Sequence, residues 1–226
     1  MEFKEFEKIL TGTFPELRPE QLEKFRAMEA LYREWNAQIN VISRKDIDEL
    51  YRHHVLHSLA IAAYLKYQQP DIYEELRANG ARCSILDLGT GGGFPGIPLA
   101  VFFPEVKFTL CDSVGKKIIV AREVSAALAL ENVETVNARA ESLPQQFDFI
   151  VSRAVTALDN FMPWVKGKYK KGILYLNGGD ITEEIARTMG RFKLPKGSVH
   201  TWPIDSWLDD EYFGEKLVIY IEKFCN

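Results

Sequence analysis

Residues 85–96 read Ile85-Leu86-Asp87-Leu88-Gly89-Thr90-Gly91-Gly92-Gly93-Phe94-Pro95-Gly96, an apolar run that passes directly into a glycine-rich segment. A strand that ends in such a turn and opens a helix is typical of the carboxyl edge of a doubly wound α/β sheet, where these folds bind ligands. Glycines let the backbone approach a ligand because no Cβ intervenes, and the following helix presents free N–H groups to an anionic group. The segment therefore predicts a cofactor-binding loop.

Short apolar stretches alternate with helical patterns from Cys83 onward. The expected strands are Ser84–Leu88, Lys107–Cys111, Val133–Asn137, Phe147–Ser152, Ile173–Asn177 and Leu217–Phe224. The expected helices lie near Ile97–Phe103, Lys116–Leu130 and Leu158–Val165. This alternation predicts a mostly parallel sheet with helices on both faces. No helix precedes the last strand, so we expect that strand to pair antiparallel at an edge of the sheet.

The chain before the loop is helical in pattern. Apolar residues recur at spacings of three and four and form one stripe of a long helix: Leu22, Phe25, Met28, Tyr32, Trp35, Ile39 and Ile42. Pro19 stands where that helix would begin. A second helical stretch carries Leu50, His54, His57, Ile61 and Leu65, and Asn79-Gly80 breaks the pattern. We expect a helical region over residues 1–80 that contributes to the substrate face, and a cofactor-binding domain over residues 81–226.

Composition restricts the class of protein. A chain of 226 residues with 46% hydrophobic and 27% charged residues can build a large core. Its three cysteines, Cys83, Cys111 and Cys225, are scattered, so neither a disulfide framework nor a zinc site is expected. The N-terminus lacks a signal peptide pattern, and no apolar run approaches the roughly 18 to 20 residues that cross a bilayer. We expect a cytoplasmic monomer with no metal and no membrane partner.

Two cofactors compete for the glycine-rich loop. Gly91, Gly93 and Gly96 match the dinucleotide pattern GxGxxG, and Asp112 follows at about the expected 20-residue distance. Taken alone, this spacing is compatible with a dehydrogenase. That interpretation, however, needs a catalytic histidine or lysine at a recognisable site in the second half of the chain, and the sequence offers none.

Other features favour a methyl donor. Asp87-Leu88-Gly89-Thr90-Gly91 has the acid-led DxGxG form of methyltransferases, in which the carboxylate can order the turn and hydrogen-bond the cofactor's ammonium side. Asp112 ends the second expected strand, where it can bind ribose hydroxyls. Asn137-Ala138-Arg139-Ala140-Glu141 follows the third strand, where methyltransferases hold adenine, and the fourth strand has the FDxIxS form and ends before Arg153. These features predict S-adenosylmethionine as the cofactor.

With these motifs in place, the chain resembles the glucose-inhibited division protein B family, also called ribosomal small subunit methyltransferase G. The resemblance covers nearly the whole chain. It rests on the order and spacing of several motifs: Trp35-Asn36 with Asn40-Val41, Arg52 through Ser58, Leu86 through Leu99, Leu110 through Lys117, and Ser152-Arg153-Ala154.

The resemblance implies a Rossmann-like class I methyltransferase fold, with a seven-stranded sheet and an N-terminal helical region. It implies methylation of N7 of a guanine in 16S (small-subunit) ribosomal RNA. By motif, the cofactor would contact Gly89, Phe94, Ala140, Glu141 and Arg153. The chain departs from the family in two places: His57 stands where the family usually has Asp, and Asn177-Gly178 where it usually has Lys-Gly. The roles of these two positions are therefore left open.

The residues after the fourth strand fit methylation of a ring nitrogen. Exocyclic amines usually need an Asn/Asp-Pro-Pro-Tyr/Phe motif there, but this chain reads Ser152-Arg153-Ala154-Val155. Methylation of pyrimidine C5 needs a cysteine nucleophile, and the only cysteine near this edge is Cys111, beside the ribose acid. Guanine N7 carries an in-plane lone pair and needs only alignment with the methyl group. We therefore expect no general base.

Two alternatives stay open. The same fold serves methyltransferases of small molecules and proteins, whose sites can look equally bare. A non-catalytic ribosome assembly factor could keep the cofactor as a structural ligand, although intact Asp87, Gly89, Gly91 and Asp112 argue against that.

A net charge of −4 requires that RNA binding rely on a local basic surface. We expect that surface at the cofactor edge, from Arg52, His54, Lys116 and Lys117, together with Arg44 and Lys45. Lys166, Lys168, Lys170 and Lys171 form the densest cluster, but they precede the fifth strand and belong to the opposite edge. His53 and His57 are four residues apart without a third ligand, which indicates surface or interface histidines rather than a metal site.

Overall fold

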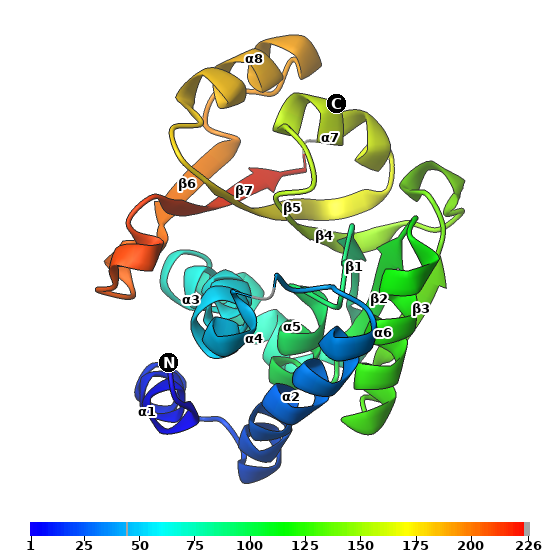
Figure 1. The fold of residues 1–226 in the computed structure, drawn as a ribbon. Coiled ribbons are helices and arrows are strands. Elements are labelled where there is room, and N and C mark those ends of the chain that lie inside the picture. Colours follow the sequence, from blue (N-terminus) through cyan, green and yellow to red (C-terminus); the bar gives the residue numbers. More distant parts are fainter. Residues whose placement is uncertain (44, 224–226) are drawn as a thin grey trace.

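The computed structural model describes residues 1–43 and 45–223. Strand β1 (Ser84–Leu88), which leads into the glycine-rich loop, lies inside a seven-stranded sheet of order β3-β2-β1-β4-β5-β7-β6 (Figure 1). The other strands are β2 (Lys107–Asp112), β3 (Val133–Asn137), β4 (Phe147–Arg153), β5 (Tyr169–Gly178), β6 (Val199–Pro203) and β7 (Lys216–Glu222). Strands β1 to β5 are mutually parallel, and β7 is antiparallel to both of its neighbours. The expected fold class is confirmed.

The strand order places a ligand site beside the glycine-rich loop. From β1 the chain builds outward through β2 to β3, and then returns to add β4 on the other side of β1. In open α/β sheets ligands bind at this kind of topological switch point, outside the carboxyl ends of the strands. The ends of β1, β2 and β4 therefore define the edge at which the site has to lie.

One expectation about the C-terminal strands is wrong. β7 is antiparallel, as expected, but Leu217 pairs with both Asn177 of β5 and Pro203 of β6, so β7 is not the edge strand. The edge is β6, which the sequence pattern did not predict, and helix α8 (Thr182–Phe192) was not predicted either. A proline is tolerated at an edge because its missing N–H would face outward. The expected strand end at Phe224, like Cys225, lies outside the described residues.

The N-terminal helices are α1 (Phe3–Thr13), α2 (Pro19–Gln38), α3 (His57–Gln68) and α4 (Pro70–Ala78). Pro19 begins α2, as expected, but the helix stops at Gln38, before the last apolar positions of the stripe. The stop has a local cause, because the Asn36 Oδ1 atom accepts hydrogen bonds from the backbone N–H groups of Val41 and Ile42, each at 2.9 Å. A π-helical segment, Leu50–Leu56, then runs directly into α3.

The two faces of the sheet bury two separate hydrophobic cores. Side chains alternate along each strand, so Ile85 and Phe108 join one core whereas Leu86 and Ile150 join the other. The first core also contains side chains from all four N-terminal helices, from α5 (Gly96–Phe102) and from α6 (Gly115–Ala127). The second is covered by α7 (Leu158–Val165) and α8, on the opposite side of the sheet in Figure 1. The helical region thus completes one face of the cofactor-binding sheet.

No helix within the described residues combines the length and the apolar character that a membrane crossing needs.

Candidate active site

The glycine-rich loop needs glycine for two different reasons. Gly89, Gly91 and Gly93 have φ angles of +74°, +58° and +111°, in the region that side chains disfavour. A Cβ at Gly91 would meet no atom within 4 Å, so the loop leaves open space there. A Cβ at Gly89 would instead collide with the Val155 side chain. The loop is therefore shaped both to face a ligand and to lie close to the segment after β4.

Asp87 holds this loop from beneath. Its carboxylate is fully buried and accepts hydrogen bonds from the Thr90 hydroxyl at 2.6 Å and the Gly96 N–H at 2.7 Å, which ties the turn to the start of α5. Its second oxygen, Oδ1, has no hydrogen-bond partner among the described residues. Burial raises the pKa of Asp87 to about 7, although both hydrogen bonds act to lower it. The geometry gives Asp87 a role in ordering the turn, and its expected contact with the cofactor stays a prediction.

The N-terminal region packs onto the same loop. The Tyr32 hydroxyl, on α2, donates a hydrogen bond to the Gly92 carbonyl oxygen at 2.9 Å. Val41 lies against Gly92, where a Cβ would come within 2.7 Å of its Cγ2 atom. Phe94 packs against the Tyr32 ring with their centroids 4.7 Å apart. The loop is thus enclosed between the sheet and the helical region.

Asp112 at the end of β2 faces the loop. Its Oδ2 atom accepts a hydrogen bond from the Gly91 N–H at 3.0 Å, and its Oδ1 atom accepts one from the Val114 N–H at 2.8 Å. A carboxylate has about four lone-pair sites, so Asp112 retains acceptors for ribose hydroxyls.

A cavity of about 390 Å³ opens beside these groups. Its lining residues are Leu88, Gly89, Asp112, Ser113, Val114, Lys117, Ala138, Arg139, Ala140, Glu141, Val155 and Trp164. A carboxylate at the end of β2, an apolar surface around Ala140 and Trp164, and the open space at Gly91 suit a nucleoside cofactor. Of the expected cofactor residues, Gly89, Asp112, Ala140 and Glu141 line this cavity. The residues present therefore fit S-adenosylmethionine.

The remaining expected cofactor residues do not line this cavity. Asp87 lies below the loop, Gly91 and Phe94 belong to the loop itself, and Arg153 ends β4. The backbone turns sharply after Arg153, since Ala154 has a φ of +45°, a strained angle for a residue with a Cβ. This turn carries Val155 back over Gly89.

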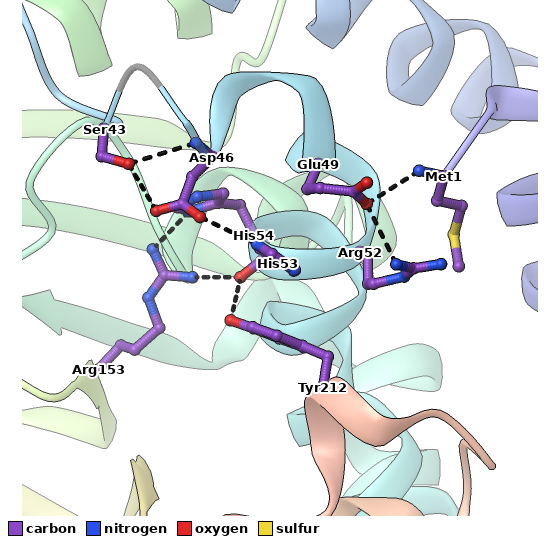
Figure 2. A network of polar contacts seen from close by, with 9 residues as sticks. All are labelled: Met1, Ser43, Asp46, Glu49, Arg52, His53, His54, Arg153 and Tyr212. Carbon is purple, nitrogen blue, oxygen red and sulfur yellow. Dashed lines mark hydrogen bonds and ion pairs between the residues drawn. The ribbon is translucent and has the colours of Figure 1, made fainter.

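Arg153 joins β4 to the N-terminal region (Figure 2). Its Nη2 atom lies 3.0 Å from the His54 Nδ1 atom, and its Nη1 donates to the His53 carbonyl oxygen at 3.3 Å. Its guanidinium carbon lies 5.3 Å from the centroid of the Phe94 ring, a cation–π distance. Within residues 1–43 and 45–223 no carboxylate forms an ion pair with Arg153, which is held instead by its hydrogen bonds to His53 and His54. Burial lowers the pKa of the guanidinium.

His53 anchors this network on the side of the helical region. Its Nδ1 atom lies 3.1 Å from the Asp46 Oδ1 atom, and Ser43 donates to the other oxygen of Asp46 at 2.8 Å. Tyr212, from the segment before β7, donates its hydroxyl to the His53 carbonyl oxygen at 3.2 Å and stacks on the His53 ring with centroids 3.8 Å apart. One carbonyl oxygen therefore receives both Tyr212 and Arg153 (Figure 2).

The histidines of this region are less exposed than expected. His57 is only 7% exposed and packs edge-on against Tyr212 and Phe213, so of the two expected places, surface or interface, the surface is wrong. Burial, and then the charge of Arg153, lower the pKa of His54 to about 3 and that of His57 well below its usual value. Both rings are neutral at physiological pH. No cluster of metal-ligating side chains occurs in the part of the chain that the structure describes.

The expected RNA-contacting residues divide into two groups. Lys116 and Lys117 begin α6 at the cavity edge, and Lys117 lines the cavity. Arg52, in contrast, pairs with Asp210 at 3.0 Å and with Glu49 at 3.5 Å, which neutralises much of its attraction for phosphate. Lys45 is exposed, whereas Arg44 lies outside the described residues.

The four lysines around the start of β5 lie at the opposite edge of the sheet, as expected, although Lys170 and Lys171 belong to β5 itself rather than preceding it. Three of these lysines already have partners: Lys168 donates to the Leu143 carbonyl oxygen at 2.6 Å, Lys170 lies 3.8 Å from Asp148, and Lys171 pairs with Glu75.

Several residues of the site were not predicted. Val155 lies two residues after Arg153, and its place after a strand at the cofactor edge could have identified it. Trp164 lines the cavity from α7, where it reads as one more apolar helix residue. Tyr212 hydrogen-bonds to His53, which lies 159 residues earlier in the sequence, and no local sequence signal exists for such a contact.

Comparison with known proteins agrees with this geometry. A family model described as rRNA small subunit methyltransferase G matches residues 21–204. Ribosomal RNA small subunit methyltransferase G of Flavobacterium psychrophilum is 48% identical over 216 residues, which cover 92% of this chain and 94% of that protein. The protein of the same name from Cytophaga hutchinsonii is 43% identical over 225 residues, covering 96% of this chain and 100% of its own length.

Among solved structures, magnesium protoporphyrin IX methyltransferase from Synechocystis PCC 6803 with bound SAM matches with a TM-score of 0.59. The match covers 92% of this chain and 99% of that one, at 10% sequence identity, so it shows a common fold.

Proposed function

Because the chain belongs to the rRNA small subunit methyltransferase G family, we propose that it methylates N7 of a guanine in small-subunit ribosomal RNA. The chain is an S-adenosylmethionine-dependent methyltransferase. When bound, this cofactor supplies an electrophilic methyl group on a sulfonium sulfur. Gly89, Gly91 and Asp112 would hold it at the carboxyl edge of the sheet, with Ala140 and Glu141 beside the adenine.

The observation that carries the choice of a ring nitrogen is the chemistry missing beside the cavity. Cys111 is fully buried, its thiol donates to the Ala138 carbonyl oxygen at 3.3 Å, and burial raises its pKa to about 11, so it is no nucleophile for pyrimidine C5. After β4 the chain offers Arg153, Ala154 and Val155, which cannot accept protons from an exocyclic amine. A purine N7 needs neither group, because its lone pair attacks directly.

The remaining groups orient the reactants. Arg153 and Phe94 lie where the cofactor loop meets the helical region, so they would position the reacting ends of both ligands. We propose that residues 1–80 supply this substrate face, while residues 81–226 supply the cofactor site. The target base must leave its stack or be presented in a loop to reach the methyl group.

A methyl-transfer assay tests the proposal. The purified chain is incubated with labelled cofactor and small-subunit RNA that lacks the modification, both as naked RNA and within the subunit. We expect label at N7 of one guanine. Label on a protein or a small molecule would support a methyltransferase of another class, and cofactor binding without any transfer would support an assembly factor.

Arg153→Ala should reduce methyl transfer strongly and lower the thermal midpoint modestly, because the buried guanidinium forms no ion pair with the described residues but donates hydrogen bonds to His53 and His54. Arg153→Lys should restore little, since an ammonium cannot reproduce the directed hydrogen bonds of a guanidinium. Rates and melting curves are measured on the same preparations. An early-melting variant whose folded fraction keeps full activity would make Arg153 a structural residue.

A further inference from the structure

The tautomer of His54 is fixed by its neighbour. A guanidinium has N–H donors and no acceptor, so the Arg153 Nη2 atom, 3.0 Å from the His54 Nδ1 atom, must donate to it. Nδ1 therefore carries the lone pair. Because the ring is neutral, its single proton resides on Nε2. His54 presents an N–H donor without a positive charge.

That donor has no acceptor. The His54 Nε2 atom is buried and lacks a hydrogen-bond partner among the residues that the structure describes. Native proteins pair nearly all buried polar groups, and those left unpaired call for an explanation such as a ligand. The ring packs against Phe94 of the cofactor loop, with centroids 5.1 Å apart, and contacts Arg153 at the end of β4. The ring that carries the unpaired donor therefore lies between the cofactor loop and the residue that ends β4.

The other unpaired buried atoms lie elsewhere. The Asp87 Oδ1 atom is beneath the loop, and His57 packs against Tyr212 and Phe213. The Arg52 Nε atom lies 3.0 Å from an oxygen of Asp210, and Ser198 precedes the edge strand β6. Only His54, of this set, contacts both the cofactor loop and the residue that ends β4.

Purine chemistry indicates what this donor recognises. The atom beside N7 on the same edge is a carbonyl oxygen, O6, in guanine, whereas adenine carries an amino group there. An N–H donor at this point attracts the O6 oxygen of guanine and opposes the amino group of adenine.

We propose that the His54 Nε2–H group donates to O6 of the target base and thereby selects guanine over adenine. This inference rests on the proposed methylation of N7. His54 is then a specificity-determining residue, with Arg153 holding its ring in the required tautomer.

The kinetic test changes one functional group at a time on the target base of the substrate. RNA oligonucleotides carry guanosine, inosine or 2,6-diaminopurine riboside at the modified position. Inosine keeps O6 and loses the 2-amino group, whereas diaminopurine keeps the 2-amino group and has an amino group in place of O6. The wild-type chain should methylate guanosine and inosine at similar rates and diaminopurine on the order of 10²- to 10⁴-fold more slowly, because a site built around a hydrogen bond rejects analogues that cannot form it.

Three variants complete this test. His54→Ala should slow guanosine methylation and reduce the discrimination to within about tenfold, because the donor that separates the analogues is gone. His54→Gln keeps a neutral amide donor and should recover part of the selectivity. His200→Ala, on β6 beside Glu222, is the matched histidine control and should change neither rate. Full discrimination by His54→Ala, with guanosine still methylated, would overturn the inference and leave the proposed function standing.

Nitrogen-15 NMR of labelled histidine provides a reading independent of turnover. The free protein should show His54 protonated at Nε2, and this signal should shift when RNA with the target guanine is added to the complex with the demethylated cofactor. A shift produced by that cofactor alone would identify its carboxylate as the acceptor and overturn recognition of the base. A wild-type chain that methylates no RNA would overturn the proposed function and the inference together. Neither the spectra nor the glutamine variant depends on the alanine variant folding.

Discussion

Gly91 combines a backbone angle of +58° with open space where a Cβ would project. The sequence predicts a loop that approaches a ligand at this position, and the structure has both the positive φ and the open space that such a loop needs. The neighbouring Gly89 differs, since a side chain there would collide with Val155. Backbone conformation thus requires glycine at both positions, and close packing against Val155 is a second requirement at Gly89 alone.

Gly91→Val should abolish cofactor binding, because the branched side chain fills the open space and resists a positive φ. Gly91→Ala should weaken binding and destabilise the fold by about 1 kcal/mol or more. Calorimetric titration with the cofactor measures the first effect and denaturant unfolding the second. Gly190→Ala, in the interior of α8 with no atom within 4 Å of the added Cβ, is the control and should stabilise by about 0.5–1 kcal/mol. Tight binding by Gly91→Val would place the ligand elsewhere.

Asp87 predicts a pH dependence of stability. Its pKa is about 7 in the folded chain against 3.8 without burial, so between these values the folded state binds a proton that the unfolded state has lost. The contribution of Asp87 to stability therefore falls as pH rises from about 4 to 7, and is constant above 7. His54 and His57, with lowered pKa values, act in the opposite direction below pH 6.5.

Comparison of Asp87→Asn with the wild type isolates the carboxyl group, because both chains share the histidines. The difference in free energy of unfolding should move in favour of asparagine from pH 4 to pH 7 and then level off. Urea titrations at six pH values, without cofactor, measure it. A difference that does not change with pH would mean that the Asp87 carboxyl keeps an ordinary pKa.

At the scale of elements, the first turn of α6 and the start of β5 present lysines at opposite edges of the sheet. Neutralising Lys116 and Lys117 together should weaken RNA binding and lower the slope of log K against log salt by about one to two, because fewer counterions are released. Neutralising Lys166, Lys168, Lys170 and Lys171 should change the slope little. Filter binding over a series of salt concentrations measures both. Equal losses from the two sets would place the RNA face differently.

Elements with strong local patterns could be predicted from the sequence, whereas elements that form only by packing or pairing with a distant segment of the chain could not. β1 and β3 have the expected bounds because each is a short run between clear turn signals. β6, with Pro203 and partly exposed side chains, exists because β7 offers it a pairing edge, and this information lies in another segment. The candidate site divides in the same way: Asp87 and Asp112 follow from spacing, whereas the contact of His53 with Tyr212 forms only in the folded chain.

At the scale of the whole molecule, the boundary near residue 80 separates two sequence patterns but not two cores. The first core joins Phe25 and Tyr32 of α2 with Phe108 and Phe149 of the sheet. Residues 81–226 alone would expose this apolar face. We expect that fragment to show no cooperative unfolding transition, while the full chain unfolds in one.

Phe25→Ala gives a second reading of the same prediction. Its ring is fully buried, so its loss should reduce the free energy of unfolding by about 3–5 kcal/mol. Hydrogen exchange should show the protection of β1 and β4 falling together with that of α2. A fragment that folds by itself, or a variant that loosens α2 alone, would make the two regions independent domains.

The contact of Tyr32 and Val41 with Gly92 has a consequence for the order in which ligands associate. The glycine-rich loop contacts the helical region on one side and faces the cofactor cavity on the other. Binding of RNA or of the cofactor therefore cannot rearrange this loop without changing the surface that binds the other ligand. Linkage then requires reciprocity: the factor by which one ligand alters the affinity of the other is the same in both directions. RNA that binds more tightly to the cofactor-loaded protein must also raise the affinity of the protein for the cofactor by the same factor, and the Gly92 segment is the part of the loop that contacts the helical region.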